Sequence, residues 1–235
     1  MKISKKARIT GLREAVAATL HGPVYSAYCI CWFVTIAVSL VSALMLTPNQ
    51  NPLSIIIVSA ISLITLIIPC ALLVLRKNQN SAIVRRFASY IKVIYIAEWI
   101  GLVFLALLLL LFAIIFLIGG DVRAKLLEVT SREGGTIISL IVSLAVIPPN
   151  LFFYKRFVRM LKETSAILEG KAADTSCFHP AAKAALMAAC AQIAWACMYI
   201  MTRGQWTAVT SVILAFLLWF VLREAAEKVN FEQTA

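Results

Sequence analysis

The stretch VIYIAEWIGLVFLALLLLLFAIIFLIGG, residues 93–120, decides the fold class of this chain. It contains one charged residue, Glu98, and no charged residue follows from Trp99 to Gly120. A helix needs about 20 mainly apolar residues to cross a bilayer, so this stretch is long enough to span one. The whole chain of 235 residues is 62% hydrophobic, which is more apolar surface than a soluble domain of this size could bury. The sequence therefore predicts an all-α, polytopic membrane helical bundle.

The order of apolar and polar segments predicts six transmembrane helices arranged as three hairpins. A basic amphipathic segment at 1–23 precedes this bundle, residues 24–222 form it, and a charged cytoplasmic tail at 223–235 follows, all in a single membrane domain. A basic loop is expected between the fourth and fifth helices, from Lys155 to Lys183. The six predicted spans are 24–46, 53–75, 93–120, 136–154, 184–201 and 205–222.

Two basic segments have the pattern of helices that lie flat on a membrane. In Lys5–Leu20 the apolar residues recur at helical spacing between basic ones, and Ser81–Lys92 has a similar division into two faces. We expect the apolar face of each segment to lie in lipid, with anionic headgroups at the cytoplasmic surface attracting the basic residues.

The distribution of Lys and Arg predicts the orientation of the chain. With both termini in the cytoplasm, the inside segments hold 18 basic residues and the outside segments hold 4. Short cytoplasmic loops carry such an excess in membrane proteins, so the prediction is a multi-pass protein of the cell (plasma or inner) membrane with both termini cytoplasmic. The formal net charge of +11 comes from these loops, and we expect no nucleic-acid partner.

Glu98 is the one ionisable residue of the third span and a candidate site residue. An acid within a spanning helix is costly in free energy and often marks a functional site. Tyr95 and Trp99 flank it, and aromatic residues of this kind gather at the headgroup level. A position at the interface, with no functional role, is the alternative interpretation.

Prolines and amides in three other spans add to this candidate site. Pro69 leaves the carbonyl of Thr65 without its helical hydrogen bond, and Pro148-Pro149 does the same in the fourth span just before Asn150. Interrupted helices in matching parts of a chain indicate a transport site, although a plain kink is the alternative. Gln192 adds an amide near mid-membrane in the fifth span. The candidate polar vestibule consists of Thr65, Pro69, Glu98, Asn150 and Gln192.

The motifs of common catalytic and cofactor sites are missing from the sequence. It has no glycine-rich phosphate loop, no HExxH motif, and no carboxylate pair or Ser–His pair in the predicted spans. Asp174, Cys177 and His179 lie close together in sequence but lack a standard zinc spacing. We expect no metal, no cofactor and no catalytic residues.

These observations favour a transport component, permease-like or channel-like, with a polar vestibule open to the cytoplasm that binds a small cation or another solute. The alternative is a non-catalytic scaffold or accessory subunit that binds a membrane or cytoplasmic protein partner through its basic cytoplasmic face. A lipid-modifying membrane enzyme is the third and least favoured hypothesis.

Overall fold

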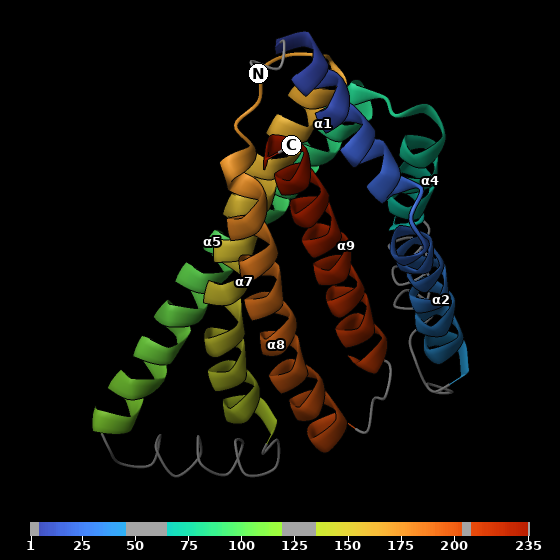
Figure 1. Ribbon diagram of the computed structural model, residues 1–235. Coiled ribbons are helices and arrows are strands. Elements are labelled where there is room, and N and C mark those ends of the chain that lie inside the picture. Colours follow the sequence, from blue (N-terminus) through green and yellow to red (C-terminus); the bar gives the residue numbers. More distant parts are fainter. Residues whose placement is uncertain (1–4, 46–64, 119–134, 204–207, 235) are drawn as a thin grey trace.

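The computed structural model describes residues 5–45, 65–118, 135–203 and 208–234 (Figure 1). Every element in these ranges is a helix, and no strand occurs among them. The elements are α1 (Lys5–Leu20), α2 (Pro23–Met45), α4 (Ile67–Asn78), α5 (Ser81–Ile118), α7 (Gly135–Leu168), the short 3-10 helix η1 (Thr175–Cys177), α8 (Phe178–Arg203) and α9 (Ala208–Thr234).

Among the described residues, five helices are long and apolar enough to cross a membrane, namely α2, α5, α7, α8 and α9. The prediction of an all-helical, multi-pass membrane protein is therefore confirmed. The predicted second span at 53–75 falls mostly outside the described residues, and α4 contains only its last part. The structure thus shows five candidate spans where the sequence predicts six.

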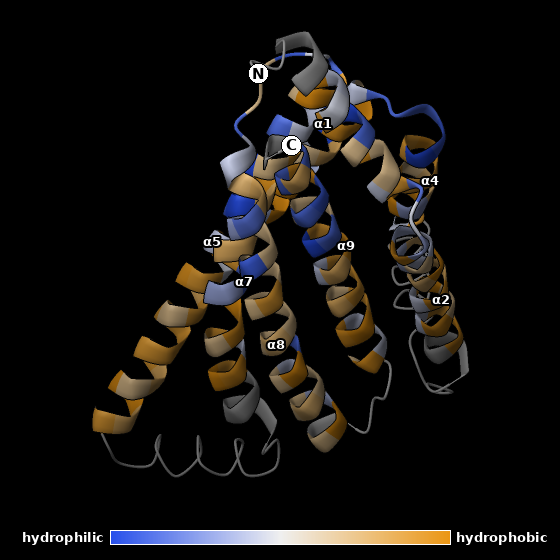
Figure 2. Cartoon of the chain, viewed as in Figure 1, coloured by the Kyte–Doolittle hydropathy of each residue, from blue (hydrophilic) through white to orange (hydrophobic). Residues whose placement is uncertain are grey.

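The helices meet at one end of the molecule, which we call the closed end. It consists of α1, the corner between α4 and α5, the turn between α7 and α8, and the last turns of α9 (Figure 1). From there α2 and α5 diverge toward the opposite end. Hydrophilic residues gather at the closed end, whereas the parts of the helices that lead away from it are mostly hydrophobic (Figure 2).

The protein core lies at the closed end and draws residues from all seven α-helices. Its most deeply buried large side chains include Phe178, Ile167 and Val229. Toward the other end α5 is exposed along most of its length, and Leu117 is 83% exposed. Because α5 is apolar there, lipid must cover this surface.

The predicted surface helix Lys5–Leu20 forms as α1 with those bounds, but its apolar face is not in lipid. Leu12, Val16 and Leu20 are buried within the protein, where α1 packs on α9 and α7. Gly11 faces the carboxylate of Glu232 on α9, which a Cβ at this position would contact. A protein surface therefore covers the face that we expected lipid to cover.

The second predicted surface helix, Ser81–Lys92, is not a separate element. It is the first part of α5, which continues to Ile118 without a break. Val84, Ala88 and Ile91 are buried against the protein, and the Phe87 ring packs edge-on to Phe157 of α7 at 6.3 Å. The apolar face was predicted correctly, but α7 covers it instead of lipid.

The predicted basic loop from Lys155 to Lys183 is mostly helix. α7 extends to Leu168 because Phe157, Met160 and Ile167 bury one face of this segment. Gly170 ends the helix with a φ of 71°. Its N–H donates to the Ile167 carbonyl at 3.0 Å and that of Lys171 donates to Ala166 at 2.9 Å, the Schellman pattern of a helix C-terminus.

The predicted tail 223–235 is helical as well, since α9 continues to Thr234. Ala226 and Val229 are buried at the contact with α1. Two ion pairs at i, i+4 spacing lie on the outer surface of this segment, Arg223–Glu227 at 2.7 Å and Lys228–Glu224 at 2.6 Å. Burial of one face explains why the helix does not end at Leu222.

Candidate polar cavity

A cavity of about 270 Å³ lies between α2, α4, α5, α7, α8 and α9. Ligand pockets in proteins start at roughly this size. None of the described residues that line it is charged. Seven lining residues are aromatic: Tyr28, Trp32, Phe87, Tyr90, Phe153, Tyr154 and Phe157.

Asn150 and Gln192 bring two amide side chains to this cavity. Asn150 is 8% exposed and lies on α7 directly after Pro148-Pro149, and Gln192 is half-buried on α8. Within the described part of the chain, neither amide has a hydrogen-bond partner. Both residues line the cavity, so water or a bound solute there is expected to hydrogen-bond with their amide groups.

Another polar group at the cavity is the indole N–H of Trp32 on α2. Its Nε1 is buried and has no hydrogen-bond partner among the described residues. The Trp32 ring packs edge-on to Tyr28 of the same helix, with ring centroids 6.5 Å apart. This contact holds the indole in place at the cavity wall while its only donor remains unused.

Small residues on α8 leave the space that the aromatic rings line. Ala185, Ala188 and Ala189 contribute to the cavity wall, and all three are buried. Rows of alanine let transmembrane helices pack closely. Gln192 follows Ala188 at i+4 on this face, so the same helix supplies both the space and a polar group.

The other three predicted site residues do not line the cavity. Glu98 is half-buried on α5, close enough to Tyr154 for their charges to interact. Pro69 is buried in α4, and its neighbour Ile68 lines the cavity in its place. Thr65 lies just before α4. The structure therefore brings Asn150 and Gln192 to one cavity and leaves Thr65, Pro69 and Glu98 outside its lining.

The structure does not interrupt the fourth predicted span at its two prolines. α7 runs through Pro148 and Pro149 as one helix from Gly135 to Leu168. The prolines still lack N–H groups, so the expectation that they free two carbonyls in the preceding turn is unchanged. Unlike the interrupted helix that the sequence predicts, α7 places Asn150 at the cavity without a break.

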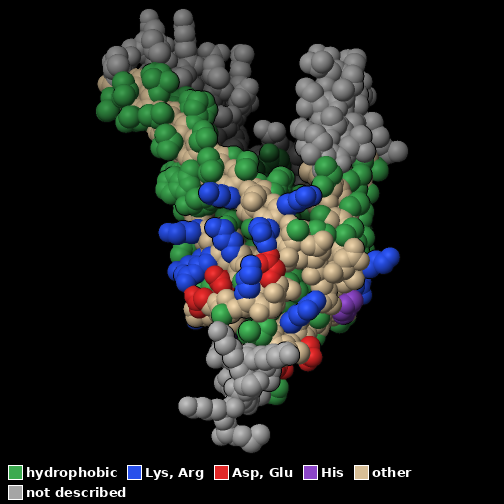
Figure 3. All heavy atoms as spheres, turned by 90° about the horizontal axis from the view of Figure 1, so that it is seen from above, with side chains coloured by type: hydrophobic (Ala, Val, Ile, Leu, Met, Phe, Trp, Pro, Cys, Tyr) green, Lys and Arg blue, Asp and Glu red, His purple; other side chains and the backbone are tan. Residues whose placement is uncertain are grey.

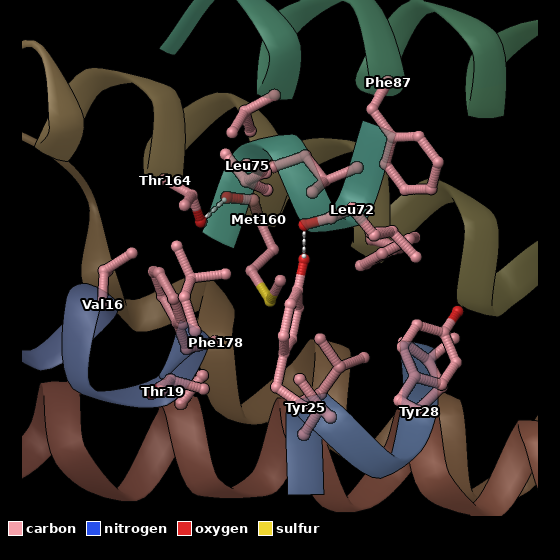
Figure 4. A pocket seen from close by; sticks show the side chains of 18 of the residues that line it. Val16, Thr19, Tyr25, Tyr28, Leu72, Leu75, Phe87, Met160, Thr164 and Phe178 are labelled. Atoms are coloured by element: carbon pink, nitrogen blue, oxygen red, sulfur yellow. Dashed lines mark hydrogen bonds between the residues drawn. The ribbon is translucent and has the colours of Figure 1, made fainter. Parts of the chain in front are cut away.

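A second, smaller cavity of about 90 Å³ lies at the closed end and shares Tyr28, Phe87, Phe157 and Leu218 with the first (Figure 4). Three of its hydroxyl groups, those of Thr19, Tyr25 and Thr164, already form hydrogen bonds. Tyr25 donates to the Leu72 carbonyl at 2.9 Å, which joins α2 to α4, and Thr164 donates to the Met160 carbonyl at 2.9 Å. Tyr25 and Tyr28 are both buried here. The smaller cavity is thus an apolar extension of the polar one.

Asp174, the acid of the weak metal motif, organises the turn that leads into α8. Its Oδ1 accepts from the Ser176 N–H at 3.1 Å, its Oδ2 accepts from Arg159 at 2.7 Å, and its own N–H donates to Glu163 at 2.8 Å. The hydrogen bonds from Ser176 and the nearby Arg159 hold the pKa of Asp174 below its usual range. These contacts give Asp174 a structural role in this turn.

Comparison with protein families, with curated proteins and with solved structures finds no match to this chain.

Trp32 and Tyr154 are among the cavity residues that the sequence did not assign to the candidate site. An indole or phenol in an apolar run has the pattern of an ordinary core or interface residue. The one usable signal was the i, i+4 spacing of Tyr28 and Trp32, which places both rings on one face of the first span.

Proposed function

We propose that this membrane protein is a transport component, permease-like or channel-like, and that the polar cavity is its solute site. The observation that carries this proposal is the set of unused polar groups on three helices: the Trp32 N–H on α2, the Asn150 amide on α7 and the Gln192 amide on α8. Inside a bundle of spanning helices, polar groups without protein partners are tolerated where they face a solute or water. A scaffold protein has no need of such groups.

The topology that we propose for this function has six spans, with both termini in the cytoplasm of a cell membrane. Two observations support it. The 18 to 4 division of basic residues favours this orientation. In addition, α1 and the last turns of α9 pack together at the closed end, so both ends of the described chain lie on the same side (Figure 1). The cavity lies next to this end, which favours access from the cytoplasm.

Flux into proteoliposomes tests the proposal. Vesicles with the purified protein should be more permeable than empty vesicles to at least one member of a panel of small neutral and charged solutes. Asn150→Leu and Gln192→Leu should lower that flux about tenfold or more, since each removes a polar group from the cavity wall. Met187→Leu on the exposed side of α8 is the matched control and should leave the flux unchanged. A wild-type protein that moves no solute in the panel would contradict the proposal.

The second candidate function is a non-catalytic scaffold, and the basic closed end favours it. Lys and Arg side chains gather on this face, with few acids among them (Figure 3). The exposed basic side chains that α5 and α7 contribute are Arg85, Arg86, Lys92, Lys155, Arg159 and Lys162. A protein that co-purifies through these residues, together with the absence of any solute flux, would favour the scaffold.

A further inference from the structure

The charges around the cavity restrict the kind of solute that it can hold. No lining residue among those described carries a charge, and Glu98, whose carboxyl group is close enough to Tyr154 for their charges to interact, is not part of the lining. A charged solute would lose its hydration on entering and gain no opposite charge, which disfavours it strongly. The cavity therefore suits an uncharged molecule.

The polar groups define which atoms this molecule needs. Trp32 offers a donor and no acceptor, so the solute must present an acceptor, such as a carbonyl oxygen or a ring nitrogen. Asn150 and Gln192 each offer a donor and an acceptor. An edge that carries both a C=O and an N–H, as in an amide or a nitrogen heterocycle, can satisfy all three residues.

The aromatic walls of the cavity add a requirement on the shape of the solute. Its aromatic rings pack against one another, with Phe153 and Phe157 stacked at 5.1 Å and Phe157 edge-on to Phe87 at 6.3 Å. Flat ring faces favour flat solutes, because aromatic groups pair by offset stacking or edge-on contact.

From these three features, and on the basis of the proposed transport function, we propose that the cavity binds a neutral, planar solute with an amide-like hydrogen-bonding edge. An organic cation is the competing class, because aromatic rings also attract quaternary ammonium groups. Such a cation has no acceptor for the Trp32 N–H and would leave that buried donor unpaired. The unused donor therefore decides in favour of the neutral solute.

Three probes of similar size and different charge test the proposal. Benzamide is neutral and carries the amide edge, benzoate is its anionic counterpart, and benzyltrimethylammonium is a cation. Binding to the full-length protein in detergent is measured by thermal shift and by Trp fluorescence at millimolar probe concentrations. We expect benzamide to bind and both charged probes to bind at least about tenfold more weakly.

Two variants connect this binding to the cavity. Trp32→Phe keeps a ring but removes the N–H, and it should weaken benzamide binding by about two- to tenfold. Trp195→Phe is the matched control, because Trp195 packs on Tyr199 and does not line the cavity. Should Trp32→Phe fail to fold, Gln192→Glu provides a second test, since the added charge should reduce benzamide binding and increase binding of the cation.

Each outcome separates this inference from the proposed function. Benzamide binding that is weakened in Trp32→Phe supports both the neutral planar solute and the use of the cavity as a solute site. Stronger binding of benzoate or benzyltrimethylammonium, lost in Gln192→Leu, overturns the neutral solute but leaves the cavity as a solute site. Binding of none of the three probes overturns the inference, and the flux experiment then decides the transport function independently.

Discussion

Tyr25 shows how one side chain joins two helices at the closed end. Its ring is 4% exposed, and its hydroxyl donates to the Leu72 carbonyl of α4 at 2.9 Å (Figure 4). We predict that Tyr25→Phe lowers the free energy of unfolding by about 1 kcal/mol, the usual net contribution of one hydrogen bond. Thermal unfolding in detergent measures this loss. Tyr95→Phe, which removes the hydroxyl of a half-buried residue on α5, should change stability by less.

Asp174 makes the stability of the folded protein depend on pH, through the turn before α8. Because its hydrogen bonds to Ser176 and the nearby Arg159 lower its pKa in the folded protein, the ionised form is favoured by folding. The resulting stability is present above the unfolded pKa, near the reference value of 3.8, and is lost as the pH falls through the lower folded pKa.

We therefore predict that Asp174→Asn flattens the dependence of stability on pH below about pH 4. The asparagine oxygen can still accept from the Ser176 N–H, whereas Asp174→Ala loses this cap as well. Melting temperatures between pH 3 and pH 7 for the three proteins check the prediction. A wild-type profile that matches the Asn variant at every pH would contradict it.

The sequence predicted those site residues that differ in polarity from the apolar spans around them. Asn150 and Gln192 are amides in apolar spans, and both line the cavity. Trp32 was not predictable, because only its surroundings show that its N–H lacks a partner. The absence of Glu98 from the cavity lining depends on the rotation of α5 about its axis, which hydropathy does not determine.

At the scale of helices, the sequence identified the apolar runs, but it ended several of them too early. The basic residues from Lys155 onward indicated a loop, yet α7 continues to Leu168. The reason is that helical periodicity persists there, with Phe157, Met160 and Leu161 on the buried face and the basic residues on the other. Hydropathy averaged over a window detects lipid-facing segments but misses helices that are covered by other parts of the protein.

The packing of α8 depends on alanines that have no exposed surface. Ala184 is 0% exposed and does not line the cavity. We predict that Ala184→Leu lowers the free energy of unfolding by about 1–3 kcal/mol, because the larger side chain must displace neighbours in a filled core. Ala194→Leu, at an exposed position of the same helix, should have almost no effect. Equal melting temperatures for the two variants would show that α8 does not pack as described.

In the part of the chain that the structure describes, charged residues gather at the closed end and the apolar surface lies away from it (Figures 2 and 3). Arg85 pairs there with Glu169, and Arg159 pairs with Asp174 at 2.7 Å. Lys92, Lys155 and Lys162 are also exposed and belong to none of these pairs. In the proposed orientation, these three lysines face the anionic headgroups of the cytoplasmic leaflet.

We predict that replacing these three lysines by glutamine reduces the preference of the protein for anionic lipid. Each basic residue near an anionic surface contributes about 1 kcal/mol, or roughly fivefold in affinity. Mass spectrometry of co-purified lipids, or exchange between nanodiscs with and without phosphatidylglycerol, measures the change. Arg223→Gln is a suitable control, since Glu227 already balances that charge at 2.7 Å. An unchanged lipid preference in the triple variant would refute this role of the basic face.

We propose that a polar cavity, reached from the cytoplasmic side, lies within the bundle. Its most direct test is the reaction of single cysteines with an uncharged, hydrophilic methanethiosulfonate reagent that does not cross the bilayer, in a protein whose six native cysteines have been replaced. Ala188 lines the cavity, whereas Ala184, one turn earlier on α8, does not. We predict that Ala188→Cys reacts in inside-out vesicles and that Ala184→Cys does not. Reaction of neither cysteine, or of Ala188→Cys only from the outer face of intact cells, would contradict the account.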